Sequence, residues 1–279
     1  MKRAAQQLIG VTIGSILGAL GLAASAGAMT LVNTELMLSI DVSGSVNEDE
    51  YALQIQGYID AFNSASVRNR ITGLSKGVAV GVNVWDFNVV SNSGFSLLNS
   101  EASIDAFVSS VLGDLLLNRP GSGGTTNIAA GINDATNALL TNDFEGDRLV
   151  IDVSGDGKQN TGTGCTTSQM ETVACTSLVT AARDAAVDAG ITINGLPILT
   201  RQFPNLDTYY SDFVIGGDGS FLVAADDFSD FSNAVEQKIE REIVPPSSES
   251  TPEPTSLLGL GLIGLAGAGA ALKRKQREI

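Results

Sequence analysis

Oxygen-bearing side chains gather in three short polar segments of the chain. The first segment alternates three of them, Asp41, Ser43 and Ser45. The second, residues 123–132, presents a threonine hydroxyl in a glycine-rich loop, and the third, residues 152–157, ends a strand with another carboxylate. Carboxylate and hydroxyl oxygens are hard ligands that favour magnesium, calcium or manganese. The sequence therefore predicts a site for one divalent cation, with magnesium expected and manganese or calcium as alternatives.

The composition excludes several other kinds of chemistry. The 279 residues contain no histidine, so serine or cysteine catalysis with a histidine base and histidine-ligated zinc are excluded. Residues 29–251 contain 10 Lys and Arg against 29 Asp and Glu, a net charge of −19. Because this charge repels phosphate backbones and no basic cluster offsets it, nucleic acid is not expected as a partner.

Strands and helices that alternate along the chain must position these polar segments. Short apolar runs predict strands, and apolar residues at helical spacing predict helices. The expected strands are residues 35–40, 78–85, 149–153, 191–193 and 220–223. The expected helices are residues 48–67, a segment marked by Ile104, Phe107, Val108 and Val111, residues 128–140 and 178–189, and a last one whose stripe is Phe228, Phe231, Val235, Ile239 and Ile243.

This alternation predicts an α/β fold in a single domain, with a mainly parallel central sheet flanked by helices on both faces. Sheets of this Rossmann-like kind place ligands at the carboxyl ends of their strands. The first and third polar segments follow two expected strands, and the second stands where a helix begins. The predicted topology therefore brings the three polar segments to one edge of the sheet.

The remaining acidic groups are interpreted without a metal. Glu48, Asp49 and Glu50 are expected to form the acidic first turn of a helix, where negative charge offsets the helix dipole. A second acidic set is interpreted as a solvated loop and helix start rather than a second calcium site; it comprises Asp218, Asp226, Asp227 and Asp230. Trp85 is expected in the core.

The three polar motifs together resemble a von Willebrand factor A-type domain with a metal-ion-dependent adhesion site. In that family a D-x-S-x-S motif, a threonine after a glycine-rich loop and an aspartate followed by glycine bind one divalent cation. Carried over to this chain, the resemblance assigns as metal ligands Asp41, Ser43, Ser45, Thr126 and Asp156. All five positions of the family's motif are filled.

The resemblance extends over residues 33–244. Thr126 is preferred to Thr125 because the family's pattern, T-N-x-x-x-[AG]-[LI], fits the chain only when it starts at Thr126. Residues 150–157 and 191–198 look like a bacterial exported subfamily of these domains whose function is unassigned.

The resemblance implies binding rather than catalysis, because the family's cation commonly takes its sixth ligand from an Asp or Glu of a partner protein. We therefore expect an exported adhesion module at the cell envelope or in extracellular matrix, whose partner is such a protein or a matrix component. One alternative is a structural matrix or exopolysaccharide-associated protein with a merely stabilising cation. A metal-dependent hydrolase is disfavoured, because the only nearby candidate base, Asp152, is expected to lie in a strand.

Residues 1–28 are expected to be a secretory signal peptide. Lys2 and Arg3 precede a short, glycine-rich apolar run that ends in small residues. The Ala26-Gly-Ala28 triplet suits a signal peptidase, and cleavage after Ala24-Ser-Ala26 is the second candidate. A transmembrane anchor is disfavoured because the run is short.

Residues 252–279 resemble the PEP-CTERM sorting signal of Gram-negative bacteria. Pro252-Glu-Pro254 precedes an apolar run over residues 257–272 and a basic tail, Lys273 to Arg277. The resemblance implies cleavage near the Pro-Glu-Pro by a membrane peptidase of the exosortase class, with the apolar run as a transmembrane segment before processing. A plain tail anchor is the alternative, because the same placement of charge serves both.

The body between these ends is therefore expected in an oxidising compartment, at the cell envelope, on the cell surface or outside the cell. There Cys165 and Cys175, ten residues apart, are expected to form a disulfide rather than two free thiols. Residues 29–244 are left as the domain, and residues 245–251 as a polar linker.

Overall fold

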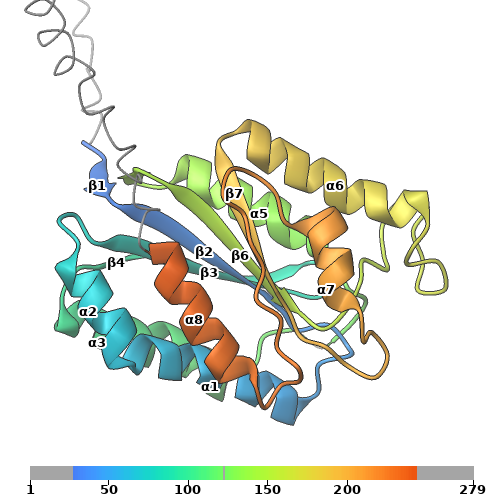
Figure 1. Ribbon diagram of the computed structural model, residues 1–279, viewed down its shortest axis with the longest axis horizontal. Helices are drawn as coiled ribbons and strands as arrows, with labels where there is room; N and C mark the ends of the chain where they lie inside the picture. Colours follow the sequence, from blue (N-terminus) through green and yellow to red (C-terminus); the bar gives the residue numbers. More distant parts are fainter. Residues whose placement is uncertain (1–27, 122, 244–279) are drawn as a thin grey trace, which may run out of the picture.

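The computed structural model describes residues 28–121 and 123–243, in which a five-stranded sheet lies between two layers of helices (Figure 1). In spatial order the sheet consists of β4 (Val89–Leu98), β3 (Val78–Trp85), β2 (Thr34–Asp41), β6 (Leu149–Gly155) and β7 (Ile191–Pro197). Neighbouring strands are parallel except β4, which runs antiparallel to β3 at one edge. A separate parallel pair is formed by β1 (Thr30–Val32) and β5 (Phe144–Gly146).

Helices cover both faces of this sheet (Figure 1). One layer contains α1 (Glu48–Asn63), α2 (Ala65–Gly73), α3 (Glu101–Phe107) and α8 (Phe231–Ile243). The other layer contains α5 (Ile128–Thr141), α6 (Val173–Asp188) and α7 (Leu206–Tyr209). A short π-helical turn, η1 (Val108–Leu112), follows α3 and leads into α4 (Gly113–Leu117). A second one, η2 (Tyr210–Val214), follows α7. The predicted α/β class, with its mainly parallel sheet in a single domain, is confirmed.

Each face of the sheet packs into its own hydrophobic core. In β2, Leu36, Leu38 and Ile40 belong to the core shared with α1 and α8. Met37 points to the opposite face and belongs to the core shared with α5 and α6, as does the fully buried Trp85. A strand buried on both faces has no solvent side, which is why β3 is almost continuously apolar in sequence. β2 is equally buried, but its apolar residues Leu36, Met37, Leu38 and Ile40 stand among four polar ones.

The helix expected over residues 48–67 is divided in two at Ser64. This residue is extended, with φ −66° and ψ 143°, and its hydroxyl accepts a hydrogen bond from Val67 N at 3.2 Å. Serine favours this capping position because its side chain satisfies an amide that the new helix leaves unpaired. The apolar spacing continues across the break, so the sequence pattern alone does not reveal it.

Two strand expectations differ from the structure. β4 was not expected because it is an edge strand with an exposed, polar middle, and Gly94 there has φ +66°. Conversely, residues 220–223 do not form a strand, and only an isolated bridge joins Leu222 to Gly195 of β7. The ladder does not extend because Phe221 N donates to the side-chain Oδ1 of Asn194, at 3.0 Å, instead of to a strand carbonyl.

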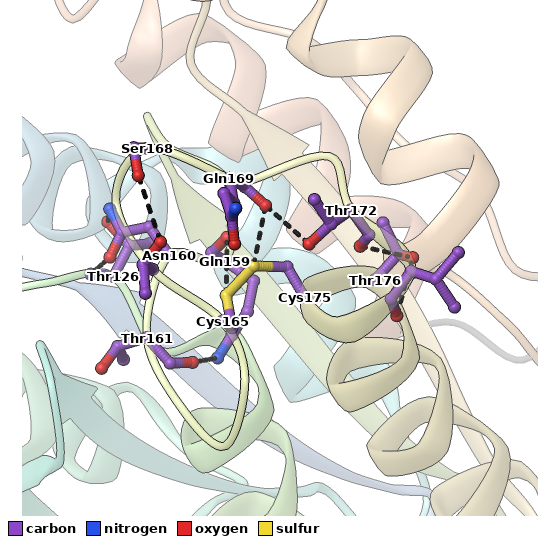
Figure 2. Close-up of a disulfide and its surroundings, with 12 residues drawn as sticks. Thr126, Gln159, Asn160, Thr161, Cys165, Ser168, Gln169, Thr172, Cys175 and Thr176 are labelled. Atoms are coloured by element: carbon purple, nitrogen blue, oxygen red, sulfur yellow. Dashed lines mark hydrogen bonds between the residues drawn. A yellow bond between two sulfur atoms is a disulfide. The ribbon is translucent and has the colours of Figure 1, made fainter.

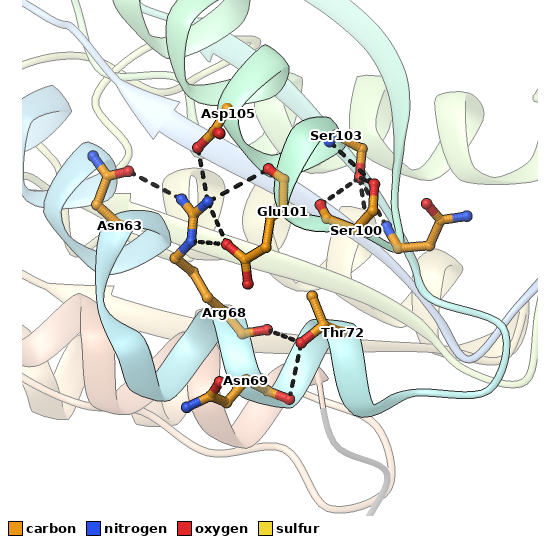
Figure 3. Close-up of polar contacts among 9 residues, drawn as sticks. Asn63, Arg68, Asn69, Thr72, Ser100, Glu101, Ser103 and Asp105 are labelled. Carbon is orange, nitrogen blue, oxygen red and sulfur yellow. Dashed lines mark hydrogen bonds and ion pairs between the residues drawn. The ribbon is translucent and has the colours of Figure 1, made fainter.

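Arg68, on α2, links this helix to α3 (Figure 3). Its Nη2 lies 2.7 Å from Asp105 Oδ1 and its Nε donates to Glu101 Oε2 at 2.5 Å, both on α3. The two carboxylates are exposed, so we assign these pairs at most about 1 kcal/mol each. They orient α2 on α3 and lie away from the polar motifs.

A buried charge cluster fixes α8 to the sheet. Lys238 Nζ lies 2.5 Å from Asp152 Oδ1 on β6 and 2.5 Å from Glu242 Oε1, and all three side chains are fully buried. Asn194 Nδ2 donates to the same Glu242 oxygen at 2.9 Å. Burial raises the pKa of Glu242 to about 7, with the nearby Asp152 charge adding to the shift. Asp152 is thus a strand residue, as expected, and its charge is paired with Lys238.

Candidate metal site

The parallel pairing of β2 and β6 brings two polar motifs together. Asp41 is the last residue of β2, and Asp156 directly follows the last residue of β6. The strands are neighbours, with Ile40 opposite Ser154, so both aspartates stand at the same carboxyl edge of the sheet. Thr126 reaches this edge from the segment that precedes α5.

Hydrogen bonds join the five predicted ligands into one cluster. The Oγ atoms of Ser43 and Ser45 are 3.3 Å apart, and Ser43 Oγ is 3.0 Å from Thr126 Oγ1. Ser45 Oγ donates to Asp156 Oδ1 at 2.6 Å. Ser43 N donates to Asp41 Oδ1 at 2.8 Å, which closes the D-x-S turn. The structure therefore brings all five side chains together, although they come from three separate parts of the chain.

Asp41 has a carboxylate oxygen that the described protein atoms leave unsatisfied. The side chain is fully buried, and its Oδ2 has no hydrogen-bond partner within residues 28–121 and 123–243. Burial raises the pKa of Asp41 to about 8, and the neighbouring charge of Asp156 adds to the shift. Burial likewise raises the pKa of Asp156 to about 6, against the hydrogen bond from Ser45. A cation between the two carboxylates would satisfy the orphaned oxygen and offset the negative charge.

The cluster is buried on one side and open on the other. Ser43, Thr126 and Asp156 are each at most 4% exposed, whereas Ser45 is exposed. A cation held here by two carboxylates and three hydroxyls would remain reachable from solvent, so a further ligand could bind it. The residues present therefore fit a hard divalent cation with an open coordination position.

Glycine permits the close packing behind Asp41. A Cβ on Gly155 would lie 2.8 Å from both Asp41 Cβ and Asp41 Oδ2, and 3.0 Å from Tyr210 Oη. Real side chains do not tolerate such contacts, so a larger residue would displace the carboxylate. Gly155 is thus part of the site's geometry, although the sequence motif does not include it.

The segment that carries the disulfide holds Thr126 in place (Figure 2). Asn160 Oδ1 accepts from Thr126 N at 2.7 Å, and Asn160 N donates to Thr126 O at 3.0 Å. Gln159 Oε1 accepts from Ala129 N at 3.1 Å in the first turn of α5. Sequence reasoning missed both amides, and the available signal was their position three and four residues after Asp156.

The expected disulfide is present between Cys165 and Cys175. It closes the loop of residues 165–175 and ties it to the first turn of α6; Cys165 is 5% exposed and Cys175 is fully buried. Asn160 lies outside this loop, but Cys165 Sγ is 3.7 Å from the backbone oxygen of its neighbour Gln159, so the bridge lies against the residues that bind Thr126 and α5.

Other acidic groups have structural contacts instead of a place in the cluster. Glu50 closes a capping box, in which its Oε2 accepts from Asn47 N at 2.9 Å. Asp227 Oδ1 accepts from Ser229 N and Asp230 N at the start of α8. Within the described residues no three Asp, Glu, Cys or His side chains are grouped so as to hold a metal. The candidate site differs because hydroxyls make up most of its ligands.

No helix within residues 28–121 and 123–243 has the length and apolarity to cross a membrane. The signal peptide expected over residues 1–28 falls almost entirely outside the described residues, and the sorting signal expected over residues 252–279 lies wholly outside them.

Solved structures share this fold. The PilB minor pilin from Streptococcus sanguinis superposes with a TM-score of 0.56 at 13% identity, over 78% of this chain and 63% of the pilin chain. The pilus adhesin SpaC from Lactobacillus rhamnosus GG, in its open conformation, gives a TM-score of 0.52 at 14% identity, over 75% of this chain and 30% of the adhesin. The chain thus spans less than two thirds of either protein, and at these identities the likeness shows the fold alone.

The fold is von Willebrand factor A-like. The chain belongs to the family described as "Protein of unknown function (DUF1194)", whose model matches residues 31–247. No curated protein matches the chain.

Proposed function

We propose that the chain is an exported, metal-dependent binding module. One divalent cation, magnesium in the first place, is held by Asp41, Ser43, Ser45, Thr126 and Asp156. The observation that carries this proposal is the buried Asp41 Oδ2, which has no partner among the described residues although every other ligand of the cluster is hydrogen-bonded. Leaving such an oxygen unsatisfied costs about 1–3 kcal/mol, which a bound cation would remove.

The chain's own residues position the cation and leave one side open. Asp41 and Asp156 supply the negative charge, and the hydroxyls of Ser43 and Thr126 are neutral and buried. The bound cation supplies Lewis acidity, which attracts a further carboxylate. Because Ser45 is exposed, an Asp or Glu side chain of a partner can approach from its side.

A binding role is better supported than catalysis. The chain has no histidine, and Asp152, the one nearby candidate base, is paired with the buried Lys238. Structures with the same fold include a pilus adhesin and a minor pilin. Adhesion at the cell envelope or in extracellular matrix fits both observations, with a protein ligand or a matrix component as the partner.

Export and processing are part of the same proposal. A signal peptide over residues 1–28 would deliver the domain across the membrane, and an exosortase-class peptidase would cut near Pro252-Glu-Pro254. Before cleavage the apolar run behind that motif would hold the precursor in the membrane. The disulfide Cys165–Cys175 is compatible with the oxidising compartment that this route implies.

The test is capture of partners from envelope and matrix fractions of the native host, with magnesium or with a chelator. We expect the wild-type protein to retain a partner only with magnesium and Asp41→Asn to lose it. Asp188→Asn, which removes one exposed carboxylate at the end of α6, is the matched control and should retain the partner.

The same capture experiment distinguishes a cation that is needed for partner binding from one that only stabilises the fold. If chelation lowers the melting temperature of the wild-type protein but leaves the captured partner in place, the cation supports only the fold. In that case the structural matrix alternative replaces the adhesion module.

A further inference from the structure

A cavity lies at the opposite end of the sheet from the candidate metal site. Its volume is about 600 Å³, and its lining includes Arg148, which precedes β6, and Thr192, the second residue of β7. Gln237 and Arg241 of α8 complete that side. The seven residues of β6 separate it from Asp156, a distance of about 20 Å at the usual rise of a strand. The cavity is therefore independent of the metal site.

Arginine is concentrated around this cavity in an otherwise acidic protein. Residues 28–243 contain 10 Lys and Arg against 28 Asp and Glu, yet Arg70, Arg148 and Arg241 all line it. Two acids, Asp218 and Glu240, also line it. Glu240 Oε2 lies 3.3 Å from Arg70 Nη2, so its charge is already paired.

Arg241 is held flat and presents its donors. Its guanidinium carbon lies 3.7 Å from the centroid of the Phe221 ring, which is only 8% exposed and therefore fixed. Within residues 28–121 and 123–243, Arg241 has no hydrogen-bond or ion-pair partner. An arginine stacked in this way is preorganised to bind a planar anion through two parallel hydrogen bonds.

Arg148 adds a second, more buried positive charge. It is half-buried, and its Nη1 donates to the backbone oxygen of Glu242 at 3.1 Å. Burial lowers the pKa of Arg148, because the charged form loses hydration there. The charge of Glu242 opposes that shift, and an anion in the cavity would act in the same direction as Glu242.

We propose that this cavity binds an acidic sugar of the hexuronate class. The carboxylate would lie against Arg241 and Arg148, because guanidinium groups match carboxylates in geometry and charge. Thr192 and Gln237 would supply hydroxyl and amide partners for the ring hydroxyls. A cavity of about 600 Å³ is within the usual size of small-ligand sites. This function goes beyond the proposed metal-dependent binding and does not rest on it.

The test is a calorimetric titration. D-Glucuronate is added, in the presence of a chelator, to protein recovered from its host. D-Glucose serves as the neutral match, and inorganic phosphate tests whether any oxyanion suffices. We expect saturable glucuronate binding, with glucose and phosphate at least about tenfold weaker. The chelator should not matter, because the metal site is not involved.

Variants locate the site. Arg241→Gln should weaken glucuronate binding about tenfold or more, since it removes the stacked guanidinium from an exposed helix position. Arg201→Gln makes the same charge change beyond the carboxyl end of β7 and should bind as the wild type does. Gln237→Ala tests the cavity lining a second time without changing any charge, and it should also weaken glucuronate binding. Melting temperatures check that each variant is folded.

Three results would overturn the proposal. Absence of saturable glucuronate binding to the wild-type protein would reject the site. Equal binding by Arg241→Gln and Arg201→Gln would show that glucuronate binds elsewhere. Phosphate binding as tight as glucuronate binding, or tighter, would replace the sugar with a simple oxyanion.

Discussion

Asp41 contributes to stability in a direction that depends on pH and on the cation. Its pKa is about 8 in the folded protein against an ordinary 3.8, so between these values the folded state holds a proton that the unfolded chain has released. The contribution of Asp41 to the free energy of unfolding is therefore complete below about pH 4 and is lost as the pH rises to about 8. Asp156, with a pKa of about 6, acts in the same direction.

Magnesium should consequently stabilise the protein more at pH 8 than at pH 5, because the cation and protons compete for the same carboxylates. We expect the magnesium-induced gain in the free energy of unfolding to be larger at pH 8 by at least about 1 kcal/mol. Thermal unfolding with magnesium or chelator at both pH values measures it. In Asp41→Asn the difference should largely disappear. A magnesium effect of the same size at both pH values in the wild type would contradict this account of Asp41.

Gly155 tests the geometry behind the same carboxylate. Gly155→Ala places a Cβ 2.8 Å from Asp41 Oδ2, so the carboxylate must move. We expect a loss of about 1–3 kcal/mol in unfolding free energy and a clear loss of magnesium affinity. Gly73→Ala, where an added Cβ meets nothing within 4 Å, is the matched control and should leave affinity unchanged. Wild-type affinity in Gly155→Ala would show that Asp41 is not fixed by this packing.

At the scale of elements, the Cys165–Cys175 bridge is expected to contribute both to the free energy of unfolding and to magnesium binding. The double variant Cys165→Ser, Cys175→Ser should have a free energy of unfolding lower by about 2–3 kcal/mol. This is the value expected when the unfolded chain regains the entropy that closing so short a loop removes. Magnesium affinity should fall as well, because Cys165 lies against Gln159, the neighbour of the Asn160 that binds Thr126 N.

Chemical denaturation and magnesium titration of the double variant measure the two effects. Asn160→Ala in the bridged protein separates them, since it should weaken magnesium binding with a smaller loss of stability. Unchanged magnesium affinity in both variants would show that Thr126 is positioned without the segment.

The buried elements and the site motif could be predicted from sequence, for physical reasons. β3 is buried on both faces, so its apolar run marks the strand at residues 78–85, as expected. The D-x-S-x-S spacing projects alternate side chains to one side of a turn after a strand, which is why Asp41, Ser43 and Ser45 were identified. Parallel strand ends then account for the meeting with Asp156.

Contacts between distant, individually ordinary residues could not be predicted. Asn160 is an amide in a polar loop, and its hydrogen bond to Thr126 N can be recognised only from the folded structure. Lys238 interrupts the apolar stripe of α8, and its partner Asp152 is 86 residues away in the chain. Edge strand β4 was missed because half-exposed strands lack the apolar run that marks buried ones.

At the scale of the whole molecule, the proposed signals at the ends of the chain would determine where the domain acts. The sorting-signal proposal predicts that protein recovered from the host's surface or medium ends near Pro252-Glu-Pro254, because a sequence rich in Pro and Ser precedes that motif and is expected to leave it accessible to a membrane peptidase. Intact-mass spectrometry measures the end. Recovery of protein that still contains Lys273 to Ile279 would favour the tail-anchor alternative.

The acidic body makes the cation essential to the proposed binding. Residues 29–251 have a net charge of −19, so a partner's carboxylate approaches against repulsion until it is close to the site. Screening confines that repulsion to about 8–10 Å at physiological ionic strength. A cation at the strand ends would supply a local attraction for that carboxylate.

The most direct test of the central claim is a calorimetric magnesium titration of the wild-type protein and of a triple variant, Ser43→Ala, Thr126→Ala and Asp156→Ala. The proposed site predicts one magnesium ion bound with modest affinity by the wild type and none by the folded triple variant. Magnesium binding of equal strength in both proteins would contradict it.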